Sequence, residues 1–562
     1  MGVSLAVAAF LALSWTAHHH WDEFFYLFSS AVHTPRELMR LDAAVDLFPQ
    51  GYFSGKIGHV VLLHALTGMV GDGREVLLGL EALYAALVLA AVGAGWGLFR
   101  ELLPPSEARR TALVLLCLPV TGYLAYKLLS EVPSLLLTTL GCWAFVRGFR
   151  ASRRRDTAVL LGGAAVLLAG GMLCRVTSVL AFGGLVLGLL AGGDPRFPRR
   201  AVLVRAALVG AGALVLHATV LELIGGSEIR LLLLAQAVAD QAKLFERVTA
   251  FLLFVQGFGL LLPLALRRPW PPALRTGWVW LVVTMLPNLS GHEPRYYTPA
   301  LLPFALVCAA GLGRAAELAA GRWRTPVWAA GLAALVLIDR VTLFPLMPTE
   351  VDQASLSEVA ADLGARHPTA TVLVPWLSDY CYLRFVHPAL SVRLAVSALP
   401  TSRYPGRGRW GEIAPADRQW AGPDRYIGSL PALVKASQPW YYVGWSYNPV
   451  MLRVRGLLEE VGIDLLGDPR NTGWHDHLAG SWIWTDSSLT RREVGGEGQY
   501  RVFRILRDVQ PGARGPTTSP TATTNVQSAR PVKLANAAGG AAMEGQSAKP
   551  SPRHSSARLR RF

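Results

Sequence analysis

Long apolar runs separated by short polar segments dominate the first 348 residues of the chain. Eleven of these runs come close to or reach the length of about 17–25 residues that a membrane-spanning helix needs. They lie at about 2–17, 75–99, 111–127, 131–149, 157–173, 176–192, 201–223, 248–266, 276–290, 298–313 and 326–346. A shorter apolar run at 57–70 is expected to re-enter the membrane or to lie at its interface. The pattern predicts a polytopic α-helical membrane protein with about eleven transmembrane helices in residues 1–348.

A polar stretch at residues 18–57 follows the first apolar run and is too long for a tight turn. It begins with three histidines and two adjacent carboxylates, Asp22 and Glu23, and it includes the apolar segment from Phe24 to Phe28. We expect an external loop with amphipathic helices that lie on the membrane. Ionised groups next to a hydrophobic segment are costly unless they are solvated or paired. The two carboxylates therefore either mark the water interface or have a function.

The character of the chain changes after the last apolar run. Residues 349–508 have ordinary polarity, with a helical period at 354–366, and predict a soluble α/β domain. Its other expected elements are strands at 371–374, 391–396, 440–445 and 500–506 and helices at 427–437 and 450–461. Residues 509–562 are rich in Pro, Thr, Ser, Ala and Gly and lack an apolar period, so they are predicted to be a disordered tail.

The composition favours the same class of protein. Hydrophobic residues make up 52% of the chain, charged residues only 16%, and the mean hydropathy is +0.35. A soluble protein carries about a quarter charged residues. The five cysteines are scattered without a CxxC pair, so no disulfide framework is predicted.

The positions of the arginines decide how the net charge of +16 is interpreted. They cluster in alternate loops at 100–110, 147–155, 196–205, 267–275 and 314–324. This is the signal of cytoplasmic loops, not of a nucleic-acid-binding face, so no nucleic-acid partner is expected. The N-terminus would then be cytoplasmic. The first run lacks the basic region of a signal peptide, so we expect a retained span, with cleavage near Ala17 as the alternative.

This topology brings polar segments from distant parts of the sequence to the outer side of the membrane. Asp22 and Glu23, Glu131, Arg175 and the segment 292–295 would all lie there. The odd number of spans also places residues 349–508 outside. A set of unrelated surface charges would rarely gather on one side in this way.

Several of these outer segments carry motifs that resemble the GT-C superfamily of glycosyltransferases. They are Asp-Glu after the first span, Ser-Glu-x-Pro opening the fourth, a single arginine after the fifth, and Arg-Tyr-Tyr-x-Pro-Ala-Leu-x-Pro at the tenth. The set is most similar to the protein-mannosyltransferase and lipid A aminoarabinose-transferase branch. The segment from His292 to Arg295 also resembles GPI and dolichol-linked mannosyltransferases. The resemblance covers roughly residues 1–345 and the presence of an external C-terminal domain.

The resemblance implies a GT-C-like fold in residues 1–348 and a particular reaction. Such enzymes transfer a sugar from a polyprenyl- or dolichyl-phosphate donor to a lipid, glycan or protein acceptor, and an outer-loop acid deprotonates the acceptor. The residue types suit this chemistry, since a carboxylate can take the proton and arginines hold phosphate well. Membrane lipids surround the donor's tail. No nucleotide-binding glycine motif occurs in a convincing strand–turn–helix context.

Asp22 is the preferred general base, with Glu23 as the alternative. Otherwise Glu23 caps the helix from Phe24 to Ala31 or binds the acceptor. Glu131 corresponds to the second acidic motif of the family and would orient the acceptor or hold a metal. The alternative is that its charge only stabilises the start of a helix before Pro133.

Basic and aromatic residues complete the expected site. Arg175 and Arg295 are candidate ligands of the donor phosphate, with a snorkelling interface arginine as the alternative for each. Lys127 is a further candidate, although at one helical turn before Glu131 it would also form an ion pair with that residue. His292, Glu293 and Tyr296 are assigned to the acceptor side, with Tyr296 also suited to anchor the chain at the interface.

Two questions stay open from the sequence alone. No cofactor is required, but a divalent metal ion held by His18–His20 with Asp22 and Glu131 is an alternative. The other functional classes are a transporter or flippase of lipid-linked saccharides and a non-catalytic component of polymer export. The Ala, Leu, Arg and Gly bias favours a bacterial inner membrane with the site facing the periplasm, although an endoplasmic-reticulum lumen fits the same topology.

Overall fold

The computed structural model of the protein describes residues 2–14, 18–19, 21–44, 53–224, 244–267, 269–289, 293–318, 321–342, 351–374, 377–394, 439–445, 489–497 and 500–507. All described residues belong to one compact unit, Met1–Asp508. The predicted helices at 427–437 and 450–461 and the predicted disordered tail lie outside the described residues.

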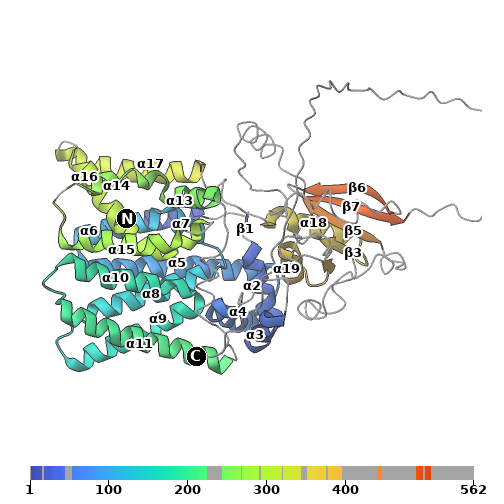
Figure 1. The fold of residues 1–562 in the computed structure, drawn as a ribbon. Helices are drawn as coiled ribbons and strands as arrows, with labels where there is room; N and C mark the ends of the chain where they lie inside the picture. The colour runs from blue at the N-terminus through green and yellow to red at the C-terminus, as the bar shows by residue number, and fades with distance from the viewer. Residues whose placement is uncertain are drawn as a thin grey trace, which may run out of the picture. The chain divides into compact units, whose positions relative to one another are not determined.

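Helices form most of the described chain before residue 343 (Figure 1). Its α-helices are α1 (Gly2–Ser14), α2 (Trp21–Val32), α3 (Pro35–Ala44), α4 (Ile57–Val70), α5 (Arg74–Leu102), α6 (Pro105–Cys117), α7 (Pro119–Leu124), α8 (Glu131–Arg147), α9 (Arg154–Cys174), α10 (Val179–Gly192), α11 (Arg199–Ile224), α13 (Leu244–Gly259), α14 (Leu262–Ala265), α15 (Pro272–Asn288), α16 (Leu301–Glu317) and α17 (Arg324–Thr342). Short 3-10 helices are η1 (Ser54–Lys56), η2 (Val176–Ser178), η3 (Pro294–Ala300) and η4 (Gly321–Trp323).

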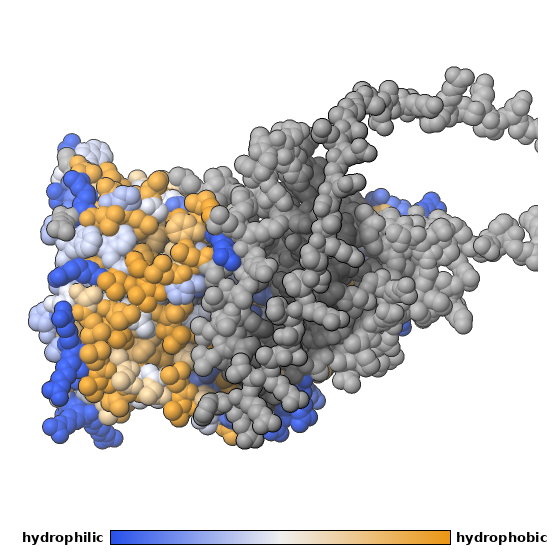
Figure 2. All heavy atoms as spheres, viewed as in Figure 1, coloured by the Kyte–Doolittle hydropathy of each residue, from blue (hydrophilic) through white to orange (hydrophobic). Residues whose placement is uncertain are grey.

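Four helices in the described part of the chain are long and apolar enough to cross a membrane. They are Arg74–Leu102, Arg154–Cys174, Arg199–Ile224 and the continuous Pro294–Glu317. A helix also overlaps each of the other predicted spans, but the run 111–127, predicted as one span, is divided between α6 and α7. Shorter apolar helices include Ile57–Val70. Figure 2 shows a hydrophobic band across the helical region, bordered at one end by hydrophilic residues. The fold is therefore that of a helical membrane protein.

The central helices pack side by side. Helix α8 contacts α5 on one side and α9 on the other, and α9 also contacts α11 (Figure 1). Helices α10 and α15 pack especially closely, because Gly184 and Gly188 face Trp280 and Thr276 across the interface. A Cβ added at Gly188 would lie 2.6 Å from the Thr276 carbonyl oxygen, so only glycine permits this approach. Small residues one turn apart are the usual means of close helix packing in membranes.

A five-stranded sheet follows the helical region, in the order β4-β3-β5-β7-β6. Its strands are β3 (Thr371–Val374), β4 (Ser391–Leu394), β5 (Trp440–Trp445), β6 (Leu489–Glu497) and β7 (Tyr500–Arg507). Strand β3 pairs parallel with β4 and β5, whereas β7 pairs antiparallel with β5 and β6. Helices α18 (Gln353–Arg366) and α19 (Leu377–Val386) pack against the sheet. The four predicted strands occur within two residues of their expected ends.

Helix α2, which carries Asp22 and Glu23, is held at two places. Just before it, the short strand β1 (His18–His19) pairs antiparallel with β2 (Val351–Asp352), with His18 opposite Asp352. Along its length, α2 packs against α4 and α19. Phe24 meets Tyr382 edge-on, with ring centroids 4.8 Å apart. The predicted amphipathic segment is thus a buried helix with polar residues at its start.

Candidate active site

The first turn of α2 places Asp22 and Glu23 in two different environments. Both are buried, with 1% and 0% of their surfaces exposed. Neighbouring residues on a helix point about 100° apart, so the two side chains diverge. Asp22 points to Lys56 and Arg295, whereas Glu23 accepts a hydrogen bond from the backbone N–H of Leu128 at 2.9 Å. The two carboxylates therefore cannot have the same role.

Arg295, at the start of η3, lies at the centre of a buried ionic cluster. Its Nη1 is 2.7 Å from Asp22 Oδ2, and its Nε is 3.6 Å from Glu131 Oε1. It also forms an ion pair with Glu293. Only 3% of Arg295 is exposed, and its partners are the nearby Glu293 and two carboxylates from distant segments, Asp22 and Glu131. The arginine is thus a bound counter-ion within the fold and not a snorkelling side chain.

Arg175 and Glu131 extend this cluster. They form a buried ion pair, and Ser130 donates a hydrogen bond to the other oxygen of Glu131 at 3.0 Å. Glu131 is the first residue of α8, as expected if its charge stabilises the start of that helix, but it also contacts Arg295. The ring of Tyr296 lies beneath both guanidinium groups, at 4.7 Å from Arg175 Cζ and 5.4 Å from Arg295 Cζ. Such cation–π contacts fix the planes of the two arginines.

Lys56 is a member of the cluster that the sequence did not single out. Its Nζ lies 3.8 Å from Asp22 Oδ2, 4.7 Å from the centroid of the Tyr26 ring, and within hydrogen-bonding distance of the Tyr26 hydroxyl. Burial lowers the pKa of Lys56, and the charge of Asp22 opposes this effect. The signal in the sequence was a single lysine directly before the apolar run 57–70, but the surrounding loop carries other charges that hide it.

We name these six residues the Arg295 cluster: Asp22, Lys56, Glu131, Arg175, Glu293 and Arg295. It contains three carboxylates and three cations, so its formal charge is balanced. Burying so many charges is costly unless each is paired. A cluster of this kind can exchange internal ion pairs for contacts with a phosphate, and that exchange would leave a carboxylate able to accept a proton.

Lys127 has a different setting from the one expected. Its charged neighbours are Glu23 and then Glu81 of α5. Residues 125–130 are not helical, so the spacing of one helical turn that would pair Lys127 with Glu131 does not apply. Glu81 in turn forms a hydrogen bond with Gln353 at the start of α18. Glu23, Glu81 and Lys127 therefore form a second group of buried ionisable residues beside the Arg295 cluster.

The remaining expected site residues are the histidines. His292 and His20 lie outside the described residues, and of His18 and His19 only the backbone pairing of β1 is described. In the part of the chain that the structure describes, no group of three His, Cys, Asp or Glu residues could hold a metal ion. The two carboxylates proposed as metal ligands, Asp22 and Glu131, both face Arg295. A divalent cation does not fit beside the positive side chains of Lys56, Arg175 and Arg295.

Comparison with known proteins places this geometry in a family context. A family model described as dolichyl-phosphate-mannose-protein mannosyltransferase matches residues 59–222. A search of curated protein sequences finds no match. The crystal structure of ArnT from Cupriavidus metallidurans bound to undecaprenyl phosphate is 15% identical, covers 92% of this chain and 99% of that chain, and has a TM-score of 0.51. ArnT in the apo state is 15% identical over 89% and 97% of the two chains, with a TM-score of 0.50.

The similarity to ArnT shows that the chain has a GT-C-like fold. Together with the family-model match, it confirms the class that the sequence motifs predicted, a GT-C superfamily glycosyltransferase. The apolar helices agree with an enzyme that is integral to a membrane.

Proposed function

We propose that this enzyme transfers a sugar from a polyprenyl- or dolichyl-phosphate donor to an acceptor at the outer face of the membrane, with Asp22 as the general base. The observation that carries the proposal is the meeting of Asp22 with Arg295 and Lys56 beside Glu131. A base and two phosphate-binding cations thereby share one buried site. Undecaprenyl phosphate, the ligand in the ArnT structure, belongs to the proposed class of leaving group.

The cations would bind the donor phosphate and stabilise the leaving group. When the bond between the sugar C1 and the phosphate oxygen breaks, both electrons stay with the oxygen, and the polyprenyl phosphate gains negative charge. Arg295 offers a planar set of donors that suits phosphate, and Lys56 offers a point charge. Glu293 and Tyr296 hold the Arg295 side chain in place. Arg175, held by Glu131, would be the second arginine available to the phosphate.

The ion pair between Asp22 and Arg295 sets the order of events. A carboxylate held by two cations is a weak base because its charged form is stabilised. A phosphate that draws Arg295 and Lys56 toward itself would release Asp22 and strengthen it as a base. The acceptor O–H would then give its proton to Asp22 as its oxygen bonds to C1. Donor binding would in this way precede activation of a lipid, glycan or protein acceptor.

The proposed setting follows from the sequence pattern. We propose about eleven membrane spans in residues 1–348, with the external loop 18–57 and an external α/β domain in residues 349–508. The site would face the periplasm of a bacterium, among membrane lipids that hold the donor's tail. Because a divalent cation does not fit among Lys56, Arg175 and Arg295, we assign no step to a metal ion.

The test is single-turnover sugar transfer by purified Asp22→Asn enzyme. The amide is almost isosteric but cannot accept the proton, so turnover should fall by about 10²- to 10⁴-fold. Donor affinity, measured separately, should change little or increase. Asp156→Asn is the matched control, because Asp156 is exposed in the first turn of α9, whereas Arg175 of the cluster follows the last turn of that helix. Full activity of Asp22→Asn would remove the proposed base, and donor counterflow without transfer would favour a transporter.

A further inference from the structure

The segment between α7 and α8 is buried and yet irregular. Residues 125–130 are not helical, and Leu128 and Leu129 have no exposed surface. Tyr126 has a φ of 63°, in the left-handed region that non-glycine residues rarely adopt. A strained backbone persists only where its surroundings determine it strongly. This segment leads directly into Glu131, so whatever holds it also places that carboxylate.

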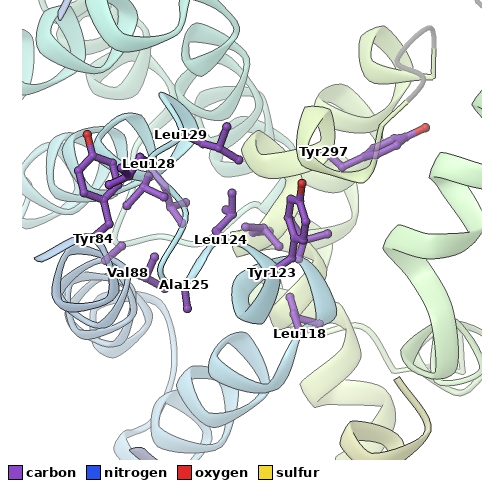
Figure 3. Close-up of a cluster of buried hydrophobic side chains, with 14 of the residues drawn as sticks. Tyr84, Val88, Leu118, Tyr123, Leu124, Ala125, Leu128, Leu129 and Tyr297 are labelled. Atoms are coloured by element: carbon purple, nitrogen blue, oxygen red, sulfur yellow. The ribbon is translucent and has the colours of Figure 1, made fainter. Parts of the chain in front are cut away.

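Two side chains from other helices hold the peptide groups of Leu128. Glu23 of α2 accepts the Leu128 N–H at 2.9 Å. His59 of α4 binds the Leu128 carbonyl oxygen through Nε2 at 3.2 Å. Figure 3 shows Leu128 on the side of the segment that faces Tyr84, with Tyr123 and Tyr297 on the other side. Side chains from other helices therefore hold both the N–H and the carbonyl oxygen of Leu128, and we call this arrangement the clamp.

Tyr84 of α5 fixes the orientation of the histidine. Since a carbonyl oxygen only accepts, Nε2 of His59 must carry the proton and donate it. In a neutral ring Nδ1 then accepts, and the Tyr84 hydroxyl lies 3.1 Å from it. The His59 ring also lies edge-on between Tyr26 and Tyr84, at centroid distances of 5.4 and 6.0 Å. One chain of hydrogen bonds thus runs from Tyr84 through His59 and Leu128 to Glu23.

We infer that Glu23, His59 and Tyr84 are positioning residues that hold the 125–130 segment so that Glu131 meets Arg175 and Arg295. This inference rests on the proposed function for its effect on turnover. Misplacing a group in a site by about 1 Å can lower the rate by about 100-fold. Glu23 therefore differs in role from Asp22, the proposed base. Glu23 acts through the backbone of Leu128 and does not touch the reacting atoms.

Amide hydrogen exchange tests the clamp without any assay of activity. In Glu23→Leu, the peptide covering residues 125–131 should exchange about 10- to 100-fold faster at its slowest amide, because a charge-assisted bond is lost. Glu23→Gln keeps an acceptor oxygen but removes the negative charge beside Lys127, so its exchange should lie between that of wild type and that of Glu23→Leu. His59→Leu should loosen the same peptide, and His59→Gln, which retains a donor at the position of Nε2, should restore protection. Unchanged exchange of residues 125–131 in both Glu23→Leu and His59→Leu would overturn the proposed clamp.

His64→Leu is the matched control for the histidine. His64 is also on α4 and also binds a backbone carbonyl, that of Ser30, at 2.7 Å, but it does not reach the 125–130 segment. It should leave exchange of residues 125–131 unchanged. Tyr84→Phe removes a single hydroxyl and should lower turnover by about 2- to 10-fold. Because Tyr84→Phe is a small change, it still tests the clamp if His59→Leu does not fold.

Kinetics separate a positioning role from a structural one. His59→Leu should lower kcat by about 10- to 100-fold with little change in the donor KM, since Lys56 and Arg295 keep their places. In a Glu131→Gln background, His59→Leu should have little further effect, because both changes disable the same group. Equal effects in the two backgrounds would overturn the assignment. If instead Asp22→Asn is fully active, the proposed function fails, while the exchange result for the clamp still stands.

Discussion

Within the Arg295 cluster, the number of partners decides which substitution is most damaging. Among the described residues, Arg295 interacts with Asp22, Glu131 and Glu293, whereas Arg175 has the single carboxylate partner Glu131. Removing one partner of a buried ion pair costs about 3–5 kcal/mol, because it leaves the other charge uncompensated. Arg295→Ala should therefore lower both thermal stability and donor affinity more than Arg175→Ala, after which Glu131 still has Arg295.

Thermal unfolding in detergent and binding of undecaprenyl phosphate measure the two effects. Arg110→Ala provides the control, since Arg110 is exposed on α6. Arg295→Lys keeps the charge but loses the planar fork of donors, so it should recover part of the stability and less of the affinity. The opposite ranking of Arg295 and Arg175 would contradict the central place given to Arg295.

Single residues also show what a sequence can and cannot reveal about a site. Asp22, Glu131 and Arg295 were identifiable because charges next to apolar runs are rare and costly. Lys56 and His59 were not, since their meaning depends on contacts with Tyr26 and Leu128 that only the folded chain creates. The clamp ends on backbone atoms, which carry no sequence signal at all.

Among the elements, α2 connects the site with the sheet-containing region. Strand β1 precedes it and pairs with β2, and its face contacts α19 through Phe24 with Tyr382 and Phe28 with Tyr380. Tyr382→Ala should lower stability by about 3–5 kcal/mol, as large aromatic truncations do. Because it also loosens α2, it should reduce turnover per folded molecule. The matched control is Tyr442→Ala, an equally buried tyrosine of β5 that contacts Phe503.

Unfolding curves and active-site titration of the folded fraction distinguish the two variants. Tyr442→Ala should lose stability but keep turnover per folded molecule. Equal turnover in both variants would mean that α19 supports the fold without influencing α2.

Regular elements were predictable where one period dominates the sequence. Apolar length gave the helices, and strand-like composition gave β3 and β5. The edge strand β6 was missed because its sequence, with Arg491, Arg492 and Glu493, has no apolar period. The run 57–70, expected to re-enter or skim the membrane, forms the helix α4, which packs on α2 and α9. The contacts of α4 with these helices determine the place of the run 57–70, which hydropathy alone does not decide.

Across the whole molecule, the arginine-rich loops have a structural role in addition to their value as a topology signal. Arg150 and Arg196 donate to the Glu101 carbonyl oxygen at the end of α5, at 2.8 and 3.3 Å. Arg314 donates to the Leu264 and Ala265 carbonyls at 3.1 and 2.9 Å. Helix C-termini leave unpaired carbonyl groups and a negative partial charge, which arginine satisfies. The arginines that create the charge asymmetry therefore also bind the C-terminal ends of the helices.

The same asymmetry predicts how the protein lies in the membrane. Loops rich in arginine stay cytoplasmic, so the segment 147–155 should face the cytosol and helix α18 the outside. We expect a membrane-impermeant maleimide, added to sealed vesicles of known orientation, to label Asp362→Cys from outside and Ser152→Cys only after permeabilisation. Both positions are exposed. The native cysteines should give little background, because Cys142, Cys174, Cys308 and Cys381 are buried and Cys117 is partly buried. Labelling of Ser152→Cys from outside, with Asp362→Cys protected, would place the Arg295 cluster at the cytosolic face and exclude the proposed outer-face transfer.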